Sequence, residues 1–203
     1  MNTNVTAGQD RTYARGRATK SHLLDVARDH FAEFGYRGSS LRDIAQRAGM
    51  SHPGLLYHFP AKEALLMAVL ERRDQVDGEV NPVRGEDGLV ALRNLVQSAY
   101  RNEGNRGVVE LFAVVSAEAT SADHPAHDFF VARYERLVER VTLAFENVKA
   151  TGLLRDGIVP GIAAVQTVAL MDGLQVQWLL GSTDLSMGDA MRAHFAALVD
   201  ADL

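Results

Sequence analysis

The chain of 203 residues has no cysteine and only five prolines. Without cysteine it forms no disulfide and no thiolate metal site, which favours a reducing compartment. The first twenty residues are polar and contain no apolar run of the signal-peptide type, so we expect neither a signal peptide nor a membrane anchor and place the protein in the cytoplasm. The apolar share of 47% is that of a globular chain with a core.

Sustained strand-like alternation is also missing, and no internal repeat is apparent. Apolar residues recur at helical spacing instead, most clearly from Phe129 to Val148, where one long amphipathic helix is expected. We therefore predict an all-α fold. Beyond residue 60 the expected helices are 62–78, 89–100, 108–119, 129–148, 161–181 and 189–199, with a loop at 81–88, a break at 101–107 and a stop at Thr151–Gly152.

Charge is unevenly distributed along the chain. The net charge is −5, but residues 1–62 hold nine Lys/Arg against five Asp/Glu, whereas the remaining 141 residues hold twelve against twenty-one. A basic segment is attracted to a phosphate backbone and an acidic body is repelled by it. The sequence thus predicts that only the N-terminal third approaches nucleic acid.

Residues 40–62 contain the pattern of a helix-turn-helix. Ser40 is a predicted N-cap with Asp43 at the third helical position, and Gly49 is the residue best able to take the positive φ that ends a helix. Ser51 supplies the next N-cap before a Pro that is tolerated only in a first turn. The second helix then begins near His52, is about two turns long, and presents its first residues outward. The buried stripe of the first helix is expected at Leu41, Ile44, Ala45 and Ala48.

The same stretch resembles the N-terminal domain of the tetracycline-repressor-like (TetR) family. The resemblance runs from Lys20 to Leu66 and is specific because several residues agree in order and spacing: Phe31 to Tyr36, Asp43-Ile44-Ala45, Gly49, Tyr57-His58-Phe59 and Lys62-Glu63-x-Leu65-Leu66. One departure is Leu56, which stands where the family usually has a second aromatic residue, so one phosphate-contacting hydroxyl is missing.

The resemblance implies two domains. A three-helix DNA-binding domain would occupy residues 20–66, with Leu23, Ala27, Phe31 and Phe34 as the buried stripe of its first helix. A larger helical domain for ligand binding and dimerisation would occupy residues 67–203, and Met171-Asp172-Gly173-Leu174 looks like the family's penultimate helix. Residues 1–19 precede the first domain. From Arg11 to Lys20 they carry four basic residues and no acid, which indicates either a mobile arm that follows DNA or a tail with no specific role.

The candidate DNA contacts divide into base readers and phosphate contacts. His52 can donate or accept at a base edge, Pro53 can contact a thymine methyl, Gly54 permits close approach, and Arg42 can bridge to guanine or bind phosphate. Tyr57, His58 and Lys62 are assigned to phosphate, although Tyr57 could be a core aromatic and His52 a solvated helix-start residue. The full predicted set is Ser40, Arg42, Ser51, His52, Pro53, Gly54, Tyr57, His58 and Lys62.

A homodimer is the predicted assembly. The helix at 161–181 is apolar around most of its circumference, but its polar residues, among them Gln166 and Asp172, argue against a membrane span, so a second copy is the simplest partner. A two-fold dimer would bind a palindrome with half-sites about 34–36 Å apart. A ligand that swings the two readers out of register would then lower the affinity for DNA.

The ligand cavity is predicted from residues on the surrounding helices, each of which could equally be plain core. The candidates are Tyr100, Phe112, His127, Phe130, Tyr134, Met171, Gln175 and Trp178, with Glu110 and Glu118 beside them. Asp123, His124, His127 and Asp128 could suggest a metal, but with Pro125 between the histidines a helix-start role is favoured. We predict no metal and no cofactor.

These features favour a ligand-responsive transcriptional regulator that binds double-stranded DNA, most simply a repressor released from a palindromic operator by a small-molecule inducer. The alternative is a protein that sequesters a small molecule and keeps a vestigial helix-turn-helix. An enzyme is not expected, because the chain has no Gly-rich phosphate loop and no nucleophile-elbow context. The effector, the operator, the regulated genes and the sign of regulation are not predicted by the sequence.

Overall fold

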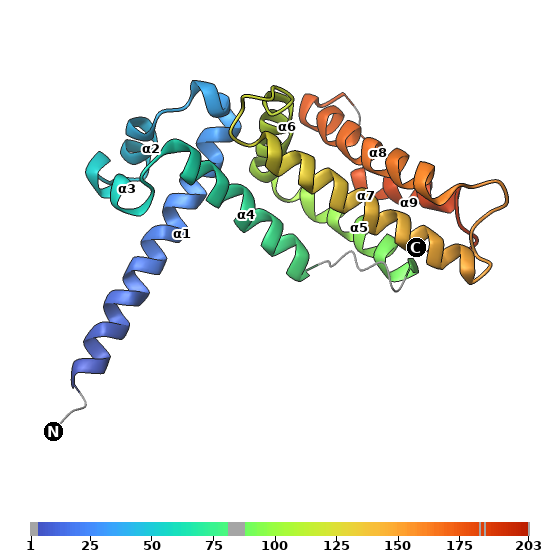
Figure 1. Ribbon diagram of the computed structural model, residues 1–203, viewed down its shortest axis with the longest axis horizontal. Helices are drawn as coiled ribbons and strands as arrows, with labels where there is room; N and C mark the ends of the chain where they lie inside the picture. Colours follow the sequence, from blue (N-terminus) through green and yellow to red (C-terminus); the bar gives the residue numbers. More distant parts are fainter. Residues whose placement is uncertain (1–3, 81–87, 183, 185, 203) are drawn as a thin grey trace.

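The computed structural model describes residues 4–80, 88–182, 184 and 186–202, and their regular structure is helical throughout apart from one isolated β-bridge, Leu154 to Val199 (Figure 1). The all-α prediction is confirmed. No described helix is both long and apolar enough to cross a bilayer. The helices are α1 Asn4–Gly38, α2 Leu41–Arg47, α3 His52–His58, α4 Lys62–Val80, α5 Gly88–Glu103, α6 Arg106–Glu118, α7 His127–Ala150, α8 Pro160–Leu180 and α9 Met187–Ala196.

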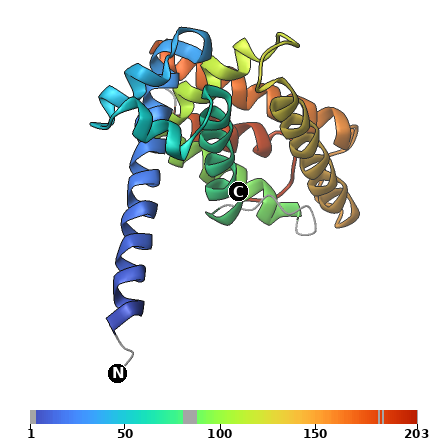
Figure 2. The ribbon, with the colours of Figure 1, turned by 60° about the vertical axis from the view of Figure 1, so that its left-hand side comes forward.

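The largest difference from the predicted elements lies at the start of the chain. Residues 11–20, expected as an arm without regular structure, belong to α1, which begins at Asn4 and projects beyond the helices of the body (Figures 1 and 2). The segment contains Gly16 but no Pro, and Ala, Arg and Lys favour a helix, so nothing stops α1 from extending toward the N-terminus. The predicted loop at 81–88 lies outside the described residues, except that Gly88 begins α5.

A kink at Gly35 ends the regular part of α1. Its backbone has φ 67° and ψ 178°, a region open almost only to glycine. A Cβ at Gly35 would lie 2.6 Å from Oε1 of Glu118 on α6, so the glycine also makes room for the contact between α1 and α6. The kink turns Tyr36 into the core, where its side chain is 8% exposed.

Replacing Gly35 with Ala is therefore expected to lower the free energy of unfolding by about 1–3 kcal/mol from backbone strain, with a further loss as the Glu118 carboxylate is displaced. The control is Gly152→Ala, because Gly152 has φ 75° but nothing within 4 Å of its Cβ position. Urea denaturation of both variants measures the difference. Equal losses would mean that the contact with Glu118 adds nothing.

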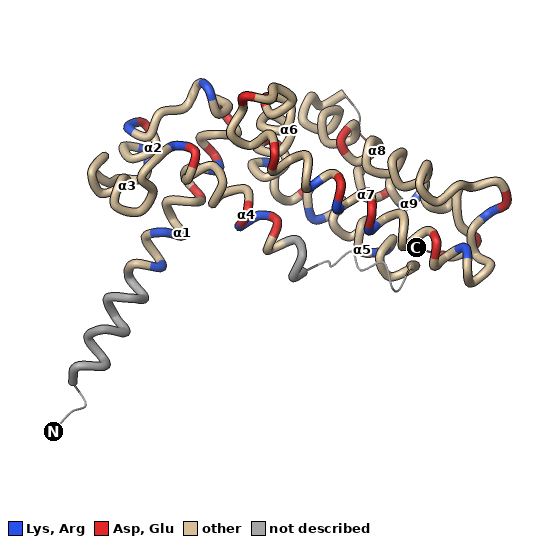
Figure 3. Tube along the Cα trace, in the orientation of Figure 1, with Lys and Arg blue, Asp and Glu red and all other residues tan. Residues whose placement is uncertain are grey.

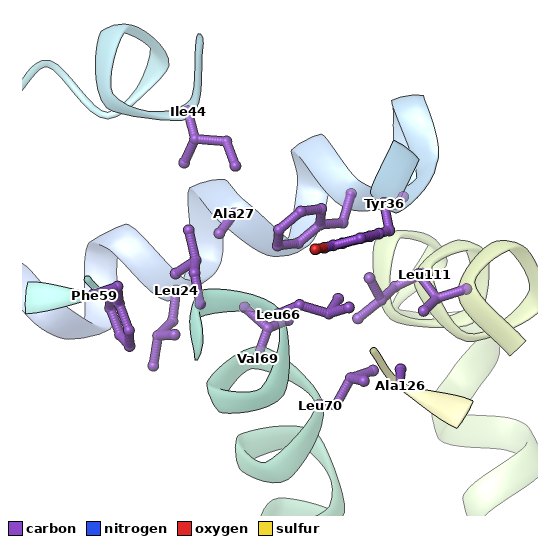
Figure 4. Packing of buried hydrophobic residues seen from close by; sticks show 14 of the residues in the cluster. Leu24, Ala27, Tyr36, Ile44, Phe59, Leu66, Val69, Leu70, Leu111 and Ala126 are labelled. Atoms are coloured by element: carbon purple, nitrogen blue, oxygen red, sulfur yellow. The ribbon is translucent and has the colours of Figure 1, made fainter. Parts of the chain in front are cut away.

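The first hydrophobic core joins the N-terminal helices to the body. Leu66, Val69 and Leu70 of α4 pack between α1 on one side and Leu111 of α6 and Ala126, just before α7, on the other (Figure 4). The three N-terminal helices therefore share one core with α6 and the start of α7. A movement of α6 would therefore displace the N-terminal helices, because close-packed cores transmit displacement.

The expected stripe of α1 is confirmed at Leu23, Ala27 and Phe31, which are all 0% exposed, and wrong at Phe34, which is 49% exposed. Phe34 immediately precedes the Gly35 kink, and its ring rests against His30 with centroids 4.7 Å apart. Helical periodicity places Phe34 on the same face as Leu23, Ala27 and Phe31, but it does not show where along the helix that face stops being covered.

The second core lies in the body and is built by α5, α7, α8 and α9. Its centre contains Phe145 and Phe195, with ring centroids 6.1 Å apart, and Met191, all buried completely. Helix α8 turns Ala163, Ala164 and Leu174 toward this core. The opposite face of α8 is apolar and is not covered by the other residues that the structure describes. The sequence predicts such a face, because the helix is apolar around most of its circumference.

Candidate DNA-reading surface and ligand cavity

Local capping builds the helix-turn-helix. The Ser40 hydroxyl accepts a hydrogen bond from the Asp43 N–H at 3.2 Å and donates to the Asp43 carboxylate at 2.6 Å. The N-cap prediction is confirmed, although Asp43 accepts from the hydroxyl rather than reaching back to the backbone. Gly49 takes φ 67° in the turn. The Ser51 hydroxyl then accepts from the Gly54 N–H at 3.2 Å and starts α3 at His52, as predicted.

Helix α3 is anchored by one buried side chain and otherwise open. Leu55 is 0% exposed, whereas Tyr57 is 87% exposed, with its ring edge-to-face against His58. The alternative of Tyr57 as a core aromatic is thereby excluded. Pro53 is exposed, and His52 and Gly54 are half-buried at the start of the helix. In both ribbon views α3 lies at the edge of the molecule, away from α5–α9 (Figures 1 and 2).

Arg42 adds a positive charge to this surface. Its side chain is exposed and makes no hydrogen bond or ion pair with any residue that the structure describes. The neighbouring Arg47, by contrast, pairs with Glu33 at 2.6 Å. Basic positions also mark the part of α1 next to the α2–α3 pair, where Lys20 lies 5.4 Å from the centroid of the Phe59 ring (Figure 3). The surface is suited to an anionic partner.

Lys62 occupies a different place from the expected phosphate contact. Its ammonium group donates to the carbonyls of Tyr36 at 2.8 Å and Ser39 at 2.9 Å, and it lies 4.2 Å from the centroid of the Tyr36 ring. It therefore caps the carbonyl end of α1, which is a favourable place for a cation. From the sequence, Lys62 lies at the start of α4, where the helix dipole disfavours a cation and an external anion is expected. In the structure the carbonyl oxygens of Tyr36 and Ser39 take the place of that anion.

The junction between the N-terminal helices and the body centres on Tyr36. Its N–H donates to Glu118 at 2.6 Å, and its hydroxyl donates to Glu63 at 2.6 Å. Burial, followed by the Glu63 hydrogen bond, raises the pKa of the Tyr36 phenol well above its usual range. The His124 ring packs edge-to-face on Tyr36 with centroids 5.0 Å apart. Glu118, expected beside the ligand cavity, therefore holds the junction.

A cavity of about 310 Å³ opens within the body. Of the predicted ligand residues it contains Phe112, Tyr134, Met171 and Gln175. Its volume is at the small end of the range for small-molecule sites. The complete lining, contributed by α4, α5, α6, α7 and α8 and by Thr120, comprises Arg73, Asn102, Val108, Val109, Phe112, Ala113, Ser116, Ala117, Thr120, Arg133, Tyr134, Leu137, Val168, Met171, Asp172, Gln175 and Val176.

The other four predicted ligand residues do not line this cavity. Tyr100 bonds to Asp189 of α9, and Phe130 is 4% exposed in the first core. The ring of His127 meets the Ala119 carbonyl at 2.9 Å, and Trp178 lies under the guanidinium of Arg106. The sequence predicts the helices that carry these side chains. Which face of each helix is turned toward the cavity depends on how the helices pack. Glu110 also lies outside the lining. The predicted helix-start role suits His124, whose Nδ1 accepts from the Ala126 N–H at 3.1 Å.

The charged residues of the cavity were missed by the sequence analysis. Arg73 of α4 and Arg133 of α7 both line it, and Asp172 of α8 carries the carboxylate in the lining. Burial lowers the pKa of Arg73 to about 9, with help from Arg133 and Arg101, and lowers the pKa of Arg133 to about 10. Burial also raises the pKa of Asp172, whose carboxylate accepts from the Tyr134 hydroxyl at 2.8 Å. No sequence signal distinguishes these residues from surface charges on amphipathic helices.

Stability is expected to fall as the pH is lowered below about 6.5, the ordinary His pKa. Burial lowers the pKa values of His30, His124 and His194 in the folded chain. Below pH 6.5 the unfolded chain therefore binds protons that the folded chain does not, which favours unfolding. Urea denaturation at pH 7.5 and 5.5 measures the loss. His30→Leu should make the pH dependence shallower, whereas His22→Leu, at an exposed position of the same helix, should leave it unchanged; the same slope in both variants would contradict the assignment.

Two family models match the chain over most of its length. Residues 23–69 match the bacterial regulatory proteins of the tetR family, and residues 91–203 match the C-terminal domain of BetI-type transcriptional repressors. The second match covers more than half of the chain.

Individual proteins agree with the family models. RutR, an HTH-type transcriptional regulator of Escherichia coli K12, is 49% identical over 55 residues, 27% of this chain and 26% of RutR. The HTH-type transcriptional repressor KstR2 of Rhodococcus jostii RHA1 is 32% identical over 129 residues, 63% of this chain and 56% of KstR2. The matches thus span only about a quarter and about half of these two relatives.

A solved structure extends the likeness to the whole fold. A regulator from Saccharomonospora viridis, solved in complex with choline, superposes with a TM-score of 0.74 at 25% identity over 91% of this chain and 100% of that one. The capped α2–α3 pair, the helical body and the two family matches together show that the chain belongs to the TetR family of bacterial regulatory proteins, with a C-terminal domain of the BetI type.

Proposed function

We propose that the protein is a ligand-responsive transcriptional regulator of the cytoplasm that binds a palindromic operator as a homodimer, and that a small molecule in the body releases it. No enzymatic activity is part of this proposal. The observation that carries it is the geometry of α3, which is held by Leu55 alone and leaves Tyr57 and the residues around its N-terminus open to a partner. A major groove accepts such a helix with its N-terminal residues at the base edges.

In the proposed complex, Arg42, His52, Pro53 and Gly54 lie at base edges. Tyr57 and His58 bind phosphate, aided by Ser40 and Ser51 at the helix caps. Lys62 is left out of this set because its ammonium group is held by two backbone carbonyls. Its contribution is to fix the end of α1 against the start of α4.

The proposed dimer forms through the uncovered face of α8. Ile162, Val165, Val176 and Leu180 are 57%, 55%, 47% and 75% exposed and follow one another at helical spacing. Between them Gly173 leaves open space at its Cβ position, so a second helix can approach the backbone closely there. A second copy of α8 would bury this stripe around a two-fold axis.

The proposed control passes through α6. This helix lines the cavity with Phe112 and Ser116, and near its end Glu118 accepts from the Tyr36 N–H at the junction. A ligand that binds better when α6 is displaced would shift the N-terminal helices away from the spacing that DNA needs. A ten-fold loss of DNA affinity requires only about 1.4 kcal/mol of such differential binding.

Selection from a randomised duplex library with the purified full chain tests the proposal. We expect enrichment of an inverted repeat with half-sites about 10 base pairs apart, centre to centre, and binding that weakens steeply with salt. Failure to enrich any sequence at low salt would contradict DNA binding and favour the alternative of a sequestering protein.

A further inference from the structure

The two arginines of the cavity lie against the same aromatic ring. The guanidinium of Arg73 lies 5.1 Å from the centroid of Phe112, and that of Arg133 lies 4.8 Å from it. Arg73 also donates to the Asn102 side chain at 3.3 Å, and Arg133 donates to Asp74. These contacts hold both guanidinium groups beside the Phe112 ring.

The lining contains less negative charge. Among the described residues that line the cavity, Asp172 is the one carboxylate, and the Tyr134 hydroxyl bonds to it. Burial raises the pKa of Asp172 and so weakens it as an anion, whereas Arg133 adds to the burial that lowers the pKa of Arg73. An incoming anion would therefore gain more from this cavity than an incoming cation.

Apolar side chains also line the cavity, beside the polar Asn102, Ser116, Thr120 and Gln175. They include Val108, Val109, Leu137, Val168 and Met171. A short hydrocarbon portion of a ligand would be buried against these side chains, which stabilises binding by about 25 cal/mol per Å² of apolar surface removed from water. The volume of about 310 Å³ limits that portion to a small group.

We propose that the effector of this protein is a small amphipathic anion whose acidic group lies against Arg73 and Arg133 and whose apolar part packs on the valines and Met171. This inference rests on the proposed function, because it names the ligand class of the same cavity. A quaternary ammonium ligand is disfavoured, because the two guanidinium groups that lie over Phe112 would repel it. The cavity of this chain thus differs in charge preference from a site for choline.

Three ligands with the same tail and different head groups test the charge preference by calorimetric titration of the full chain: octanoate, octanol and octyltrimethylammonium. We expect octanoate to bind at least ten-fold more tightly than either of the others. Tighter binding of octyltrimethylammonium, equal binding of all three, or no binding of octanoate at millimolar concentration would overturn the proposal.

Two variants test which residues set the preference. Arg73→Met should weaken octanoate at least ten-fold, whereas Arg136→Ala, outside the lining and 51% exposed, should change it less than two-fold. Asp172→Asn keeps the shape of the side chain and removes the opposing charge, so it should strengthen octanoate. Weaker octanoate binding by Asp172→Asn would overturn the proposal even if the Arg73 variant does not fold.

The two proposals can fail separately. If octanoate binds as expected and the library yields no enriched duplex, the regulatory function fails while the anion assignment stands. If a duplex is enriched and octyltrimethylammonium is the ligand that binds, the anion assignment fails while the regulatory function stands.

Discussion

Replacing Ile162 and Val165 together with Asp is expected to convert the proposed dimer to a monomer and to lower the affinity for the selected duplex by about 100-fold or more. Both side chains lie on the uncovered face of α8, so the substitutions place four charges in the proposed two-fold interface. Two linked readers gain about 10²–10⁴ in avidity over one reader, and a monomer loses that gain.

The fold of the variant should persist, because both positions are more than half exposed and lie in the first two turns of α8, where a carboxylate is favourable beside the helix dipole. Light scattering gives the solution mass and a duplex titration gives the affinity. The matched control is Val131→Asp, an apolar residue of α7 that is 44% exposed. A double variant that remains dimeric would remove α8 as the interface.

Replacing Arg42 and His52 together with Ala is expected to weaken binding to the selected duplex by about 2–4 kcal/mol, or roughly 30- to 1000-fold. Arg42 is exposed and His52 is half-buried at the start of α3, so neither side chain supports the core. Truncation removes base contacts while Leu55 still anchors the helix. The variant should also bind unrelated duplexes nearly as well as the wild type, since phosphate contacts remain.

Tyr57→Phe separates the two classes of contact. Loss of a phosphate-binding hydroxyl should weaken binding by a similar factor on all duplexes and leave the preferred sequence unchanged. Arg155→Ala is the control, because Arg155 pairs with Asp200 in the body, away from the reading surface.

If the Arg42 and His52 double variant keeps the affinity and the sequence preference of the wild type, Arg42 and His52 do not read the bases.

The helix-turn-helix could be predicted from the sequence because its determinants are local. Ser40 and Ser51 cap helices whose donors lie three residues ahead, and Gly49 takes the positive φ that the turn demands. Each of these interactions closes within a few residues, so spacing alone carries the information. The order and the approximate bounds of the helices in the body followed from periodicity in the same way.

Two of the misplaced residues depend on distant partners. Lys62 donates to carbonyls at the end of α1, and Glu118 accepts from the Tyr36 N–H. The cavity arginines are a stronger example, since Arg73 and Arg133 are sixty residues apart and reach the same cavity only in the folded chain. A periodic pattern gives the face of a helix but does not identify what that face meets.

Footprinting of the selected duplex by the wild-type protein tests the central claim most directly, because it shows where the two copies of α3 contact DNA. The account predicts two protected stretches on one face of the duplex, about one helical turn apart, that weaken together when Ile162 and Val165 are replaced. A single protected stretch that is unchanged by those substitutions, or no protection at a protein concentration that saturates binding, would contradict it.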